Sequence, residues 1–216
     1  MAATVDAARP SALERNWWLR APAVLVAPRA VFASLRDESE DAVEARQEAL
    51  TAMIGLAGIA TVLATPVARA LLNDSSFSTI LIPIWAFIGG ALYSLAVYWA
   101  GGALLYGAAR RLGGLGGYRR ARHLIALSSA PLALVLFTLW PLRIAIYGED
   151  LFRTGGNDWG PGDRIFGALI YAALAWSVLL LVTGVRSVHG WSWARSVGAV
   201  TLAAALPALI VLATVI

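Results

Sequence analysis

The sequence contains no cysteine, no lysine, only two histidines and few charged residues. Charged side chains make up 14% of its 216 residues, whereas ordinary soluble domains carry about 25%. Without cysteine the chain can form neither a disulfide nor a cysteine-based metal site. Hydrophobic residues reach 59%, which is more than one buried core needs. This excess indicates a surface that faces lipid.

The acidic and basic residues fall in a few short segments and leave long charge-free windows between them. A membrane-spanning helix needs about 20 consecutive apolar residues, and five windows meet that length. We therefore predict an all-α polytopic membrane protein, built as a five-transmembrane-helix bundle. The predicted spans cover about residues 49–72, 78–109, 123–143, 164–186 and 195–216.

The segment 1–48 is predicted to be a cytoplasmic leader that precedes the five-span domain 49–216 and carries interfacial amphipathic helices. Paired tryptophans beside an arginine, and a second helix starting at Pro28, suit the headgroup layer of a membrane. In that second helix the apolar side chains share one face. The predicted membrane-interface anchors, here and between the last two spans, are Trp17, Trp18, Phe32, Trp191 and Trp193.

Orientation follows from the arginines in the connections, because cytoplasmic loops carry an excess of positive residues. Thirteen arginines lie on the side of the leader and only four on the opposite side. The count predicts a cytoplasmic N-terminus and a C-terminus outside the cell membrane. No basic stripe with interleaved aromatic residues is present, so nucleic acid is not an expected partner.

Catalytic and metal-binding patterns are missing from the sequence. The two histidines, His123 and His189, stand without an H-E-x-x-H pattern or a nearby cluster of carboxylates, and are interpreted as interfacial polar residues. Arg69 and Arg143 lie at the ends of predicted spans, where a long side chain ordinarily snorkels to the interface. We expect no enzyme activity, no catalytic residue, no cofactor and no metal.

Small residues recur at four-residue spacing in the second span, a pattern that lets helices approach closely. Gly101–Gly102 is a predicted weak point of this long helix. Ser128 and Ser129 are expected to bond to carbonyls of their own helix near a kink. The predicted groove or helix-contact residues are Gly90, Tyr93, Ser128 and Pro131.

Three segments resemble the Yip1 domain family. They are Pro28–Leu35 with its P-x-x-x-F-x-x-L pattern, Ala126–Pro131 and Gly184–Gly190, and the resemblance covers about residues 22–216. It implies a non-enzymatic five-span bundle, in the inner membrane for bacterial members. Eukaryotic members act in vesicle trafficking with small GTPases, but this leader has no motif assignable to GTPase binding.

Two hypotheses of function remain open. The first is a Yip1-like membrane protein that acts through association with membrane lipids, with another membrane protein or with a second copy of itself as a homo-oligomer. The second is a permease or channel component that moves a small solute or lipid, which requires a continuous polar path through the bundle. A closed interior around Tyr93, Ser128 and Ser177 would exclude the second hypothesis.

Overall fold

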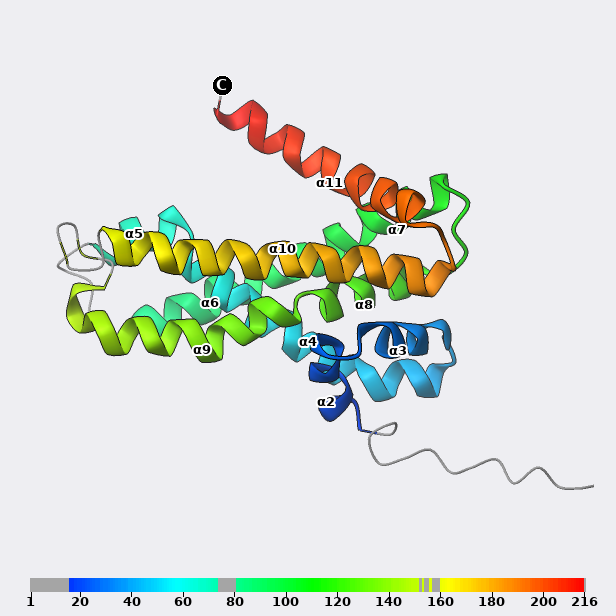
Figure 1. Cartoon of the computed structure of the whole chain (residues 1–216), viewed down its shortest axis with the longest axis horizontal. Helices are drawn as coiled ribbons and strands as arrows, with labels where there is room; N and C mark the ends of the chain where they lie inside the picture. The colour runs from blue at the N-terminus through cyan, green and yellow to red at the C-terminus, as the bar shows by residue number, and fades with distance from the viewer. Residues whose placement is uncertain (1–15, 74–80, 152, 154–155, 157–159, 216) are drawn as a thin grey trace, which may run out of the picture.

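The computed structural model describes residues 16–73, 81–151, 153, 156 and 160–215, and these residues form helices and connecting turns without a strand. Residues 1–15 of the predicted leader, the start of the second predicted span at 78–80 and Ile216 lie outside the described residues. Long helices run side by side along the molecule, and the leader packs at one end of them (Figure 1).

The leader consists of short helices. Pro28 begins a helix, as the sequence predicts, because its fixed φ suits the first helical position. The apolar face of this segment is fully enclosed, with Phe32 and Leu35 at 0% exposure, and it packs against α10. The leader elements are α2 (Trp17–Arg20), η1 (Pro22–Leu25), α3 (Pro28–Ala33) and η2 (Ser34–Arg36).

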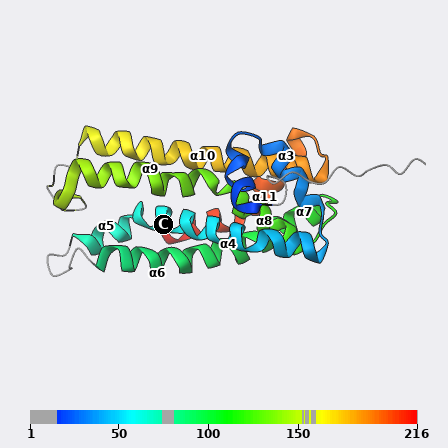
Figure 2. The same ribbon diagram turned by 90° about the horizontal axis from the view of Figure 1, so that it is seen from below.

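The bundle is built from four long helical stretches and a fifth helix beside them. Viewed from below, α9 and α10 lie on one side, with α4 and α6 on the other (Figure 2). The elements are α4 (Glu40–Leu63), α5 (Pro66–Leu72), α6 (Leu81–Ala96), η3 (Val97–Gly101), α7 (Gly102–Arg111), α8 (Tyr118–Ser128), α9 (Ala130–Tyr147), η4 (Gly148–Asp150), α10 (Pro161–His189) and α11 (Trp193–Val215).

The helix α4 starts nine residues before the predicted first span. Glu40 and Asp41 occupy its first turn, where the helix dipole favours acidic side chains, so the acidic segment begins the helix. Just before it, the backbone N–H of Ser39 donates to Asp37 (2.9 Å) and lowers the pKa of that carboxyl from its ordinary value. The helix ends at Leu63 because Pro66 follows.

Two further breaks fall where the sequence predicts them. The second long stretch changes to a π-helix over Val97–Gly101, at the predicted weak point Gly101–Gly102. The third breaks at Ser129, where Ser128 and Ser129 each donate to a carbonyl of their own helix (2.6 Å in both cases). Both serines therefore make the intrahelical bonds expected of them.

Within the part of the chain that the structure describes, three helical stretches are long and apolar enough to cross a membrane: Pro83–Arg111, Tyr118–Tyr147 and Pro161–His189. They correspond to the second, third and fourth predicted spans. The first predicted span is divided between α4 and α5, and the apolar part of α11 reaches only from Trp193 to Leu209 within the searched residues. The count of five spans therefore stays a prediction.

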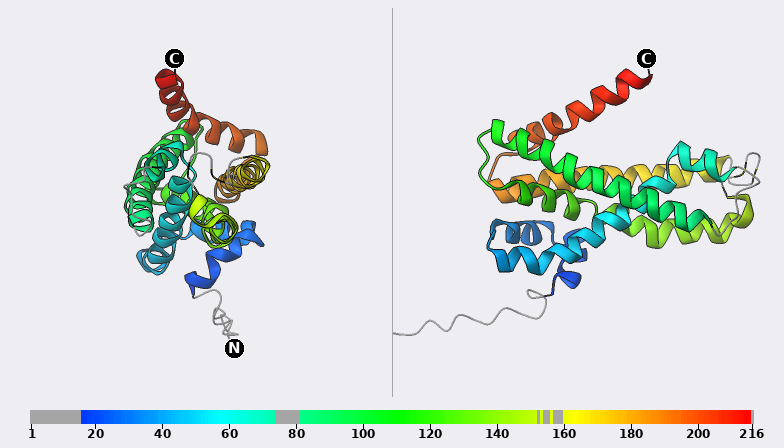
Figure 3. Two further views of the ribbon diagram at one scale, coloured as in Figure 1. Left: turned by 90° about the vertical axis from the view of Figure 1, so that its left-hand side faces the viewer. Right: turned by 180° about the vertical axis from the view of Figure 1, so that it is seen from behind.

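The helix α11 packs against α7 and α10 through its first half. Its second half runs away from the other helices toward the C-terminus, as both views of Figure 3 show. The largest core cluster lies at the leader end, where residues of the leader meet those of α4, α8 and α10. A smaller cluster around Trp140 lies toward the opposite end.

Candidate functional site

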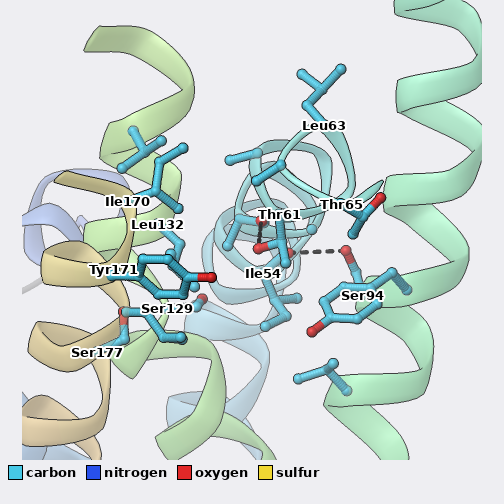
Figure 4. A pocket seen from close by; sticks show the side chains of 18 of the residues that line it. Ile54, Thr61, Leu63, Thr65, Ser94, Ser129, Leu132, Ile170, Tyr171 and Ser177 are labelled. Carbon is cyan, nitrogen blue, oxygen red and sulfur yellow. Dashed lines mark hydrogen bonds between the residues drawn. The ribbon is translucent and has the colours of Figure 1, made fainter. Parts of the chain in front are cut away.

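A cavity of about 600 Å³ lies within the bundle, in the half away from the leader. Figure 4 shows α10 on one side of it and α6 on the other, with Tyr171 and Ser177 facing Ser94 across the space and Thr61 of α4 between them. The lining continues onto α5, η3, α8 and α9. Apolar side chains from these elements make up most of the wall.

Side chains of mixed size line the α4 side of the cavity. They include Ala57, Ala60, Thr61 and Leu63, whereas the leader end of the same helix buries Leu50 completely. The alanines, which are smaller than leucine, leave part of the space between the facing helices unfilled.

The helices α4 and α6 nevertheless cross closely at one point. A Cβ built on Gly58 would lie 2.5 Å from the carbonyl oxygen of Gly90, and one built on Gly90 would lie 2.6 Å from the Cα of Ile59. The Ser94 hydroxyl is within hydrogen-bond distance of the carbonyls of Gly90 (2.5 Å) and Ile54 (3.0 Å). This contact fixes α6 against α4 and forms one wall of the cavity.

Hydroxyl groups in the lining are largely satisfied within their own helices. Thr61 donates to the carbonyl of Ala57 (2.8 Å), Ser128 to Leu124 (2.6 Å) and Ser177 to Ala173 (3.0 Å). A hydroxyl has a single hydrogen to donate, so these groups offer only acceptor lone pairs to the cavity. The cavity wall is thus weakly polar despite its serines and threonines.

One end of the cavity carries three charged residues. The Oδ1 atom of Asp163 accepts from Arg69 (2.7 Å) and from Arg143 (3.0 Å), and all three side chains contribute to the lining. The Arg143 side chain is 4% exposed, with its guanidinium near the rings of Trp140 (5.1 Å) and Phe166 (5.4 Å). The Asp163 carboxylate thus joins α10 to α5 and α9 at this end.

This cluster was not predicted from the sequence. The assignment of Arg69 and Arg143 to snorkelling is wrong for Arg143, because its side chain is buried and turned toward Asp163. Buried ionisable groups in a membrane protein are costly and often mark functional sites. One signal in the sequence is the acidic residue Asp163, which directly precedes the fourth predicted span on the same predicted side of the membrane as the two arginines.

A second polar network lies at the leader end. Arg46, 1% exposed, donates from Nε to His123 Nδ1 (3.0 Å), and His123 Nε2 lies 3.1 Å from Gln47 Oε1. Because Nδ1 accepts, His123 is neutral and carries its proton on Nε2. Gln47 in turn donates to the Tyr98 hydroxyl (3.3 Å). The network ties α4 to α8 and η3.

Arg122 sits in a box of aromatic rings beside the π-helix. Its guanidinium lies 3.9 Å from the centre of the Trp99 ring, 4.9 Å from that of Tyr118 and 5.1 Å from that of Tyr98. A Cβ on Gly102 would clash with the Arg122 side chain. The glycine therefore allows the arginine to pass close to the backbone of α7 and occupy the box.

Only some of the predicted groove or helix-contact residues line the cavity. Tyr93 and Ser128 line the cavity. Gly90 lies at the close crossing of α4 and α6. Pro131 is buried at the start of α9 and is not part of the lining.

Some of the predicted interface anchors are exposed and the others are buried. Trp18 and Trp193 are exposed, at 53% and 44%. Trp17 and Trp191 are buried, the latter stacked on His189 with ring centres 4.5 Å apart. Phe32 is fully enclosed against Gly184 and Leu124, so its side chain contacts protein and is unavailable to a headgroup layer.

Known proteins were compared with the chain in three ways. The comparisons with curated proteins and with solved structures found no match. A family model, the Yip1 domain, matches residues 23–216, which is nearly the whole chain. The match includes the leader helices from η1 onward, the cavity and the charged cluster. The chain therefore belongs to the Yip1 domain family.

Proposed function

We propose that this protein is a non-enzymatic, multi-pass membrane protein that acts by holding a membrane amphiphile in the cavity of its bundle. The observation that carries the proposal is the cavity itself, about 600 Å³ and lined mainly by apolar side chains. Ligand pockets commonly have about 300–1,000 Å³ and predominantly hydrophobic walls. In a bundle surrounded by lipid, the most abundant molecule that fits such a wall is lipid.

The dimensions of the cavity suit one acyl chain. Along α10 the lining extends from Asp163 to Leu181, which at 1.5 Å per residue is about 27 Å. This length is close to the full ~30 Å hydrocarbon thickness, so the cavity is long enough for an extended acyl chain. At about 30 Å³ per methylene-sized group, the volume share of a water molecule, the cavity holds about 20 such groups.

The membrane placement is part of the proposal. We propose five spans with a cytoplasmic N-terminus and an outer C-terminus, which the distribution of arginines supports. Since the chain has no cysteine, single cysteines can report the side of each loop. Leu115→Cys should react with an impermeant maleimide only from the cytoplasmic side, and Gly160→Cys only from outside. Labelling of both positions from one side would contradict this topology.

Filling the cavity tests the binding proposal. Gly167 lines the cavity on α10 and has open space where a Cβ would stand. Gly107 on α7 also has open space but lies away from the cavity, so it supplies a matched control. Gly167→Leu should lower the amount of lipid that native mass spectrometry finds bound to the purified protein, and Gly107→Leu should not. Equal lipid occupancy in both variants would refute the proposal.

Transport of a solute or lipid is the second candidate function. The observation in its favour is that Tyr93, Ser128 and Ser177 line an open cavity and not a closed interior. Purified protein in vesicles should then accelerate the movement of a labelled lipid or solute across the bilayer. Binding without any acceleration would favour the first proposal over this one.

A further inference from the structure

We infer that Arg122 and the aromatic rings around it bind the phosphate of a phospholipid, at the membrane surface on the side of the leader. The site consists of Arg122 and Tyr118 on α8 together with Tyr98 and Trp99 on η3. It lies apart from the cavity, whose lining includes none of these four residues. The inference therefore goes beyond the proposed function and is tested independently of it.

Arg122 is a buried cation without a hydrogen-bond acceptor. The residue is 9% exposed, and none of its N–H groups meets an acceptor within the described part of the chain. A guanidinium carries five N–H donors, and buried polar groups are ordinarily hydrogen-bonded. The faces of the aromatic rings attract its charge but supply no oxygen to these donors. Arg122 thus lacks the acceptors that a buried guanidinium normally has.

The guanidinium of Arg122 is open on one side. Of its nitrogens only Nε is completely enclosed without a partner among the described residues, so the two terminal amino groups keep access to the surface. The ring of Trp99, 3.9 Å from the guanidinium, belongs to a residue that is 47% exposed, which places the box at the outside of the bundle. Arginine binds phosphate through paired N–H donors, and the terminal amino groups supply such a pair.

The level of Arg122 along the bundle brings it close to the phosphates of a bilayer. The stretch Tyr118–Tyr147 has 30 residues, which is about 45 Å at 1.5 Å per residue. The hydrocarbon is about 30 Å thick, so about 7 Å extend beyond it at each end when the stretch is centred. Arg122 lies about 6 Å from the start of this stretch. Tryptophan and tyrosine are enriched at that boundary, which agrees with the three rings of the box.

The helices depart from regular geometry at the same place. Tyr98 and Trp99 belong to the π-helix η3, and π-helical turns occur frequently at functional sites. The Tyr118 hydroxyl donates to the carbonyl of Trp99 (2.7 Å) and joins two walls of the box. Gly102 gives Arg122 its room, because a Cβ there would clash with the arginine side chain. The guanidinium is therefore held in a defined place and does not extend freely into solvent.

No described acidic residue is paired with Arg122. Glu38 forms its ion pair with Arg120 (2.8 Å). The other described acidic residues of this end are exposed on the leader and α4 and form no ion pair with Arg122; they are Asp37, Glu40, Asp41, Glu44 and Glu48. Asp6 and Glu14 lie outside the described residues, so the experiment replaces both.

Native mass spectrometry of the full chain, stripped of lipid in a neutral detergent, measures the binding. The probes are phosphatidylglycerol, the diacylglycerol with the same acyl chains but no phosphate, and inorganic phosphate. Phosphatidylglycerol should bind about tenfold more tightly than the diacylglycerol, the range expected when a hydrogen bond to a charged group is added. An excess of inorganic phosphate should not displace it, because free phosphate lacks the acyl chains that contact the helices.

Two arginines of α8 supply a matched pair of variants. Arg122→Gln should lower the affinity for phosphatidylglycerol about tenfold and leave diacylglycerol binding unchanged. Arg119→Gln removes an exposed arginine one turn earlier on the same helix and should change either affinity less than about twofold. A melting curve for each variant verifies folding. If Arg122→Gln does not fold, Arg122→Lys and Gly102→Ala take its place, and both should reduce the preference for phosphatidylglycerol.

Four outcomes would overturn the inference. Equal affinity for phosphatidylglycerol and diacylglycerol would show that the phosphate is not recognised. Equal losses in Arg119→Gln and Arg122→Gln would show attraction by the general charge of the surface. Displacement by inorganic phosphate would show a site for free anions. A rise of about tenfold in the double variant Asp6→Asn/Glu14→Gln would show that a carboxylate of the chain itself fills the box.

A variant of the cavity separates this inference from the proposed function. Gly167→Leu, which fills the cavity and leaves the box unchanged, should keep the tenfold preference for phosphatidylglycerol over diacylglycerol. Loss of the preference in Gly167→Leu would place the phosphate in the cavity and overturn the site at Arg122. Retention of the preference, with or without lipid in the cavity, supports a separate headgroup site.

Discussion

The two ends of the bundle are built from the same helices but filled differently. At the leader end, Phe32 enters the space between α8 and α10, and both Phe32 and Leu35 are completely buried. At the other end α4, α6, α9 and α10 enclose a cavity of about 600 Å³, and no described segment of the chain enters it. The leader thus completes the packing at one end, and a ligand can complete it at the other.

The two ends also differ in how a buried arginine is bonded. Each end holds buried arginine, but Arg46 at the leader end donates to a neutral histidine (3.0 Å), whereas Arg143 at the hollow end donates to a carboxylate (3.0 Å) shared with Arg69. The first network joins helices and is enclosed. The second lies on the wall of a cavity.

Removing the side chain that fills the leader end should have the largest effect on stability. Phe32→Ala leaves a void against Gly184 and Leu124, and a buried Phe→Ala change costs about 3–5 kcal/mol. Phe137→Ala, at a side chain that is 64% exposed, should cost much less. Unfolding curves in detergent measure the difference. Equal losses would show that the leader end is not packed as described.

Disrupting the buried Arg46–His123 network should have the next largest effect on stability. His123→Leu removes the acceptor of Arg46 Nε and leaves a buried cation poorly bonded, which should cost about 2–3 kcal/mol. The double variant Arg46→Met/His123→Leu should recover much of this loss, because it replaces both partners with apolar groups. A double-mutant cycle measures the coupling between the two residues. Strictly additive losses would contradict the pairing.

Two glycines of α4, near the half of the bundle that holds the cavity, should give stability changes of opposite sign when each is replaced by alanine. Gly58→Ala places a Cβ 2.5 Å from the Gly90 carbonyl oxygen and should destabilise the crossing with α6 by about 1–3 kcal/mol. Gly55→Ala meets nothing within 4 Å and should stabilise the helix by up to about 1 kcal/mol. Thermal melts of the two variants make the comparison. The same sign for both would contradict the close crossing.

The smallest effect is expected from a hydroxyl in the cavity wall. Ser128→Ala removes a group that bonds to its own helix at Leu124 (2.6 Å), so stability should change by no more than about 0.5 kcal/mol. Amphiphile binding should also persist. Loss of solute or lipid movement in vesicles carrying this variant would instead support the transport hypothesis.

Much of the fold could be predicted from local patterns. The charge-free windows located the three long apolar stretches, Pro28 marked the start of α3, and Gly101–Gly102 marked the irregular turn of the second stretch. These features depend on residues close together in the chain. Helix length was less predictable, since α4 begins at Glu40, nine residues before the predicted first span.

The features that could not be predicted from the sequence depend on contacts between helices far apart in the chain. The apolar face around Phe32 has the same pattern whether it meets lipid or protein, and only the glycine at position 184 of α10 leaves room for its ring. Asp163 lies 94 residues from Arg69 in the chain, so neither residue alone indicates the pair. The cavity likewise is lined by helices that are far apart in the chain, such as α4 and α10.

The most direct test of the central claim is to locate a bound acyl chain. Palmitate with a photoreactive diazirine at its last carbon would be cross-linked to the protein and the labelled residues identified by mass spectrometry. We predict labelling of side chains that line the cavity, such as Ile54, Val97, Ile125 or Leu181. Labelling confined to outward-facing side chains such as Phe87 and Phe137 would contradict the claim.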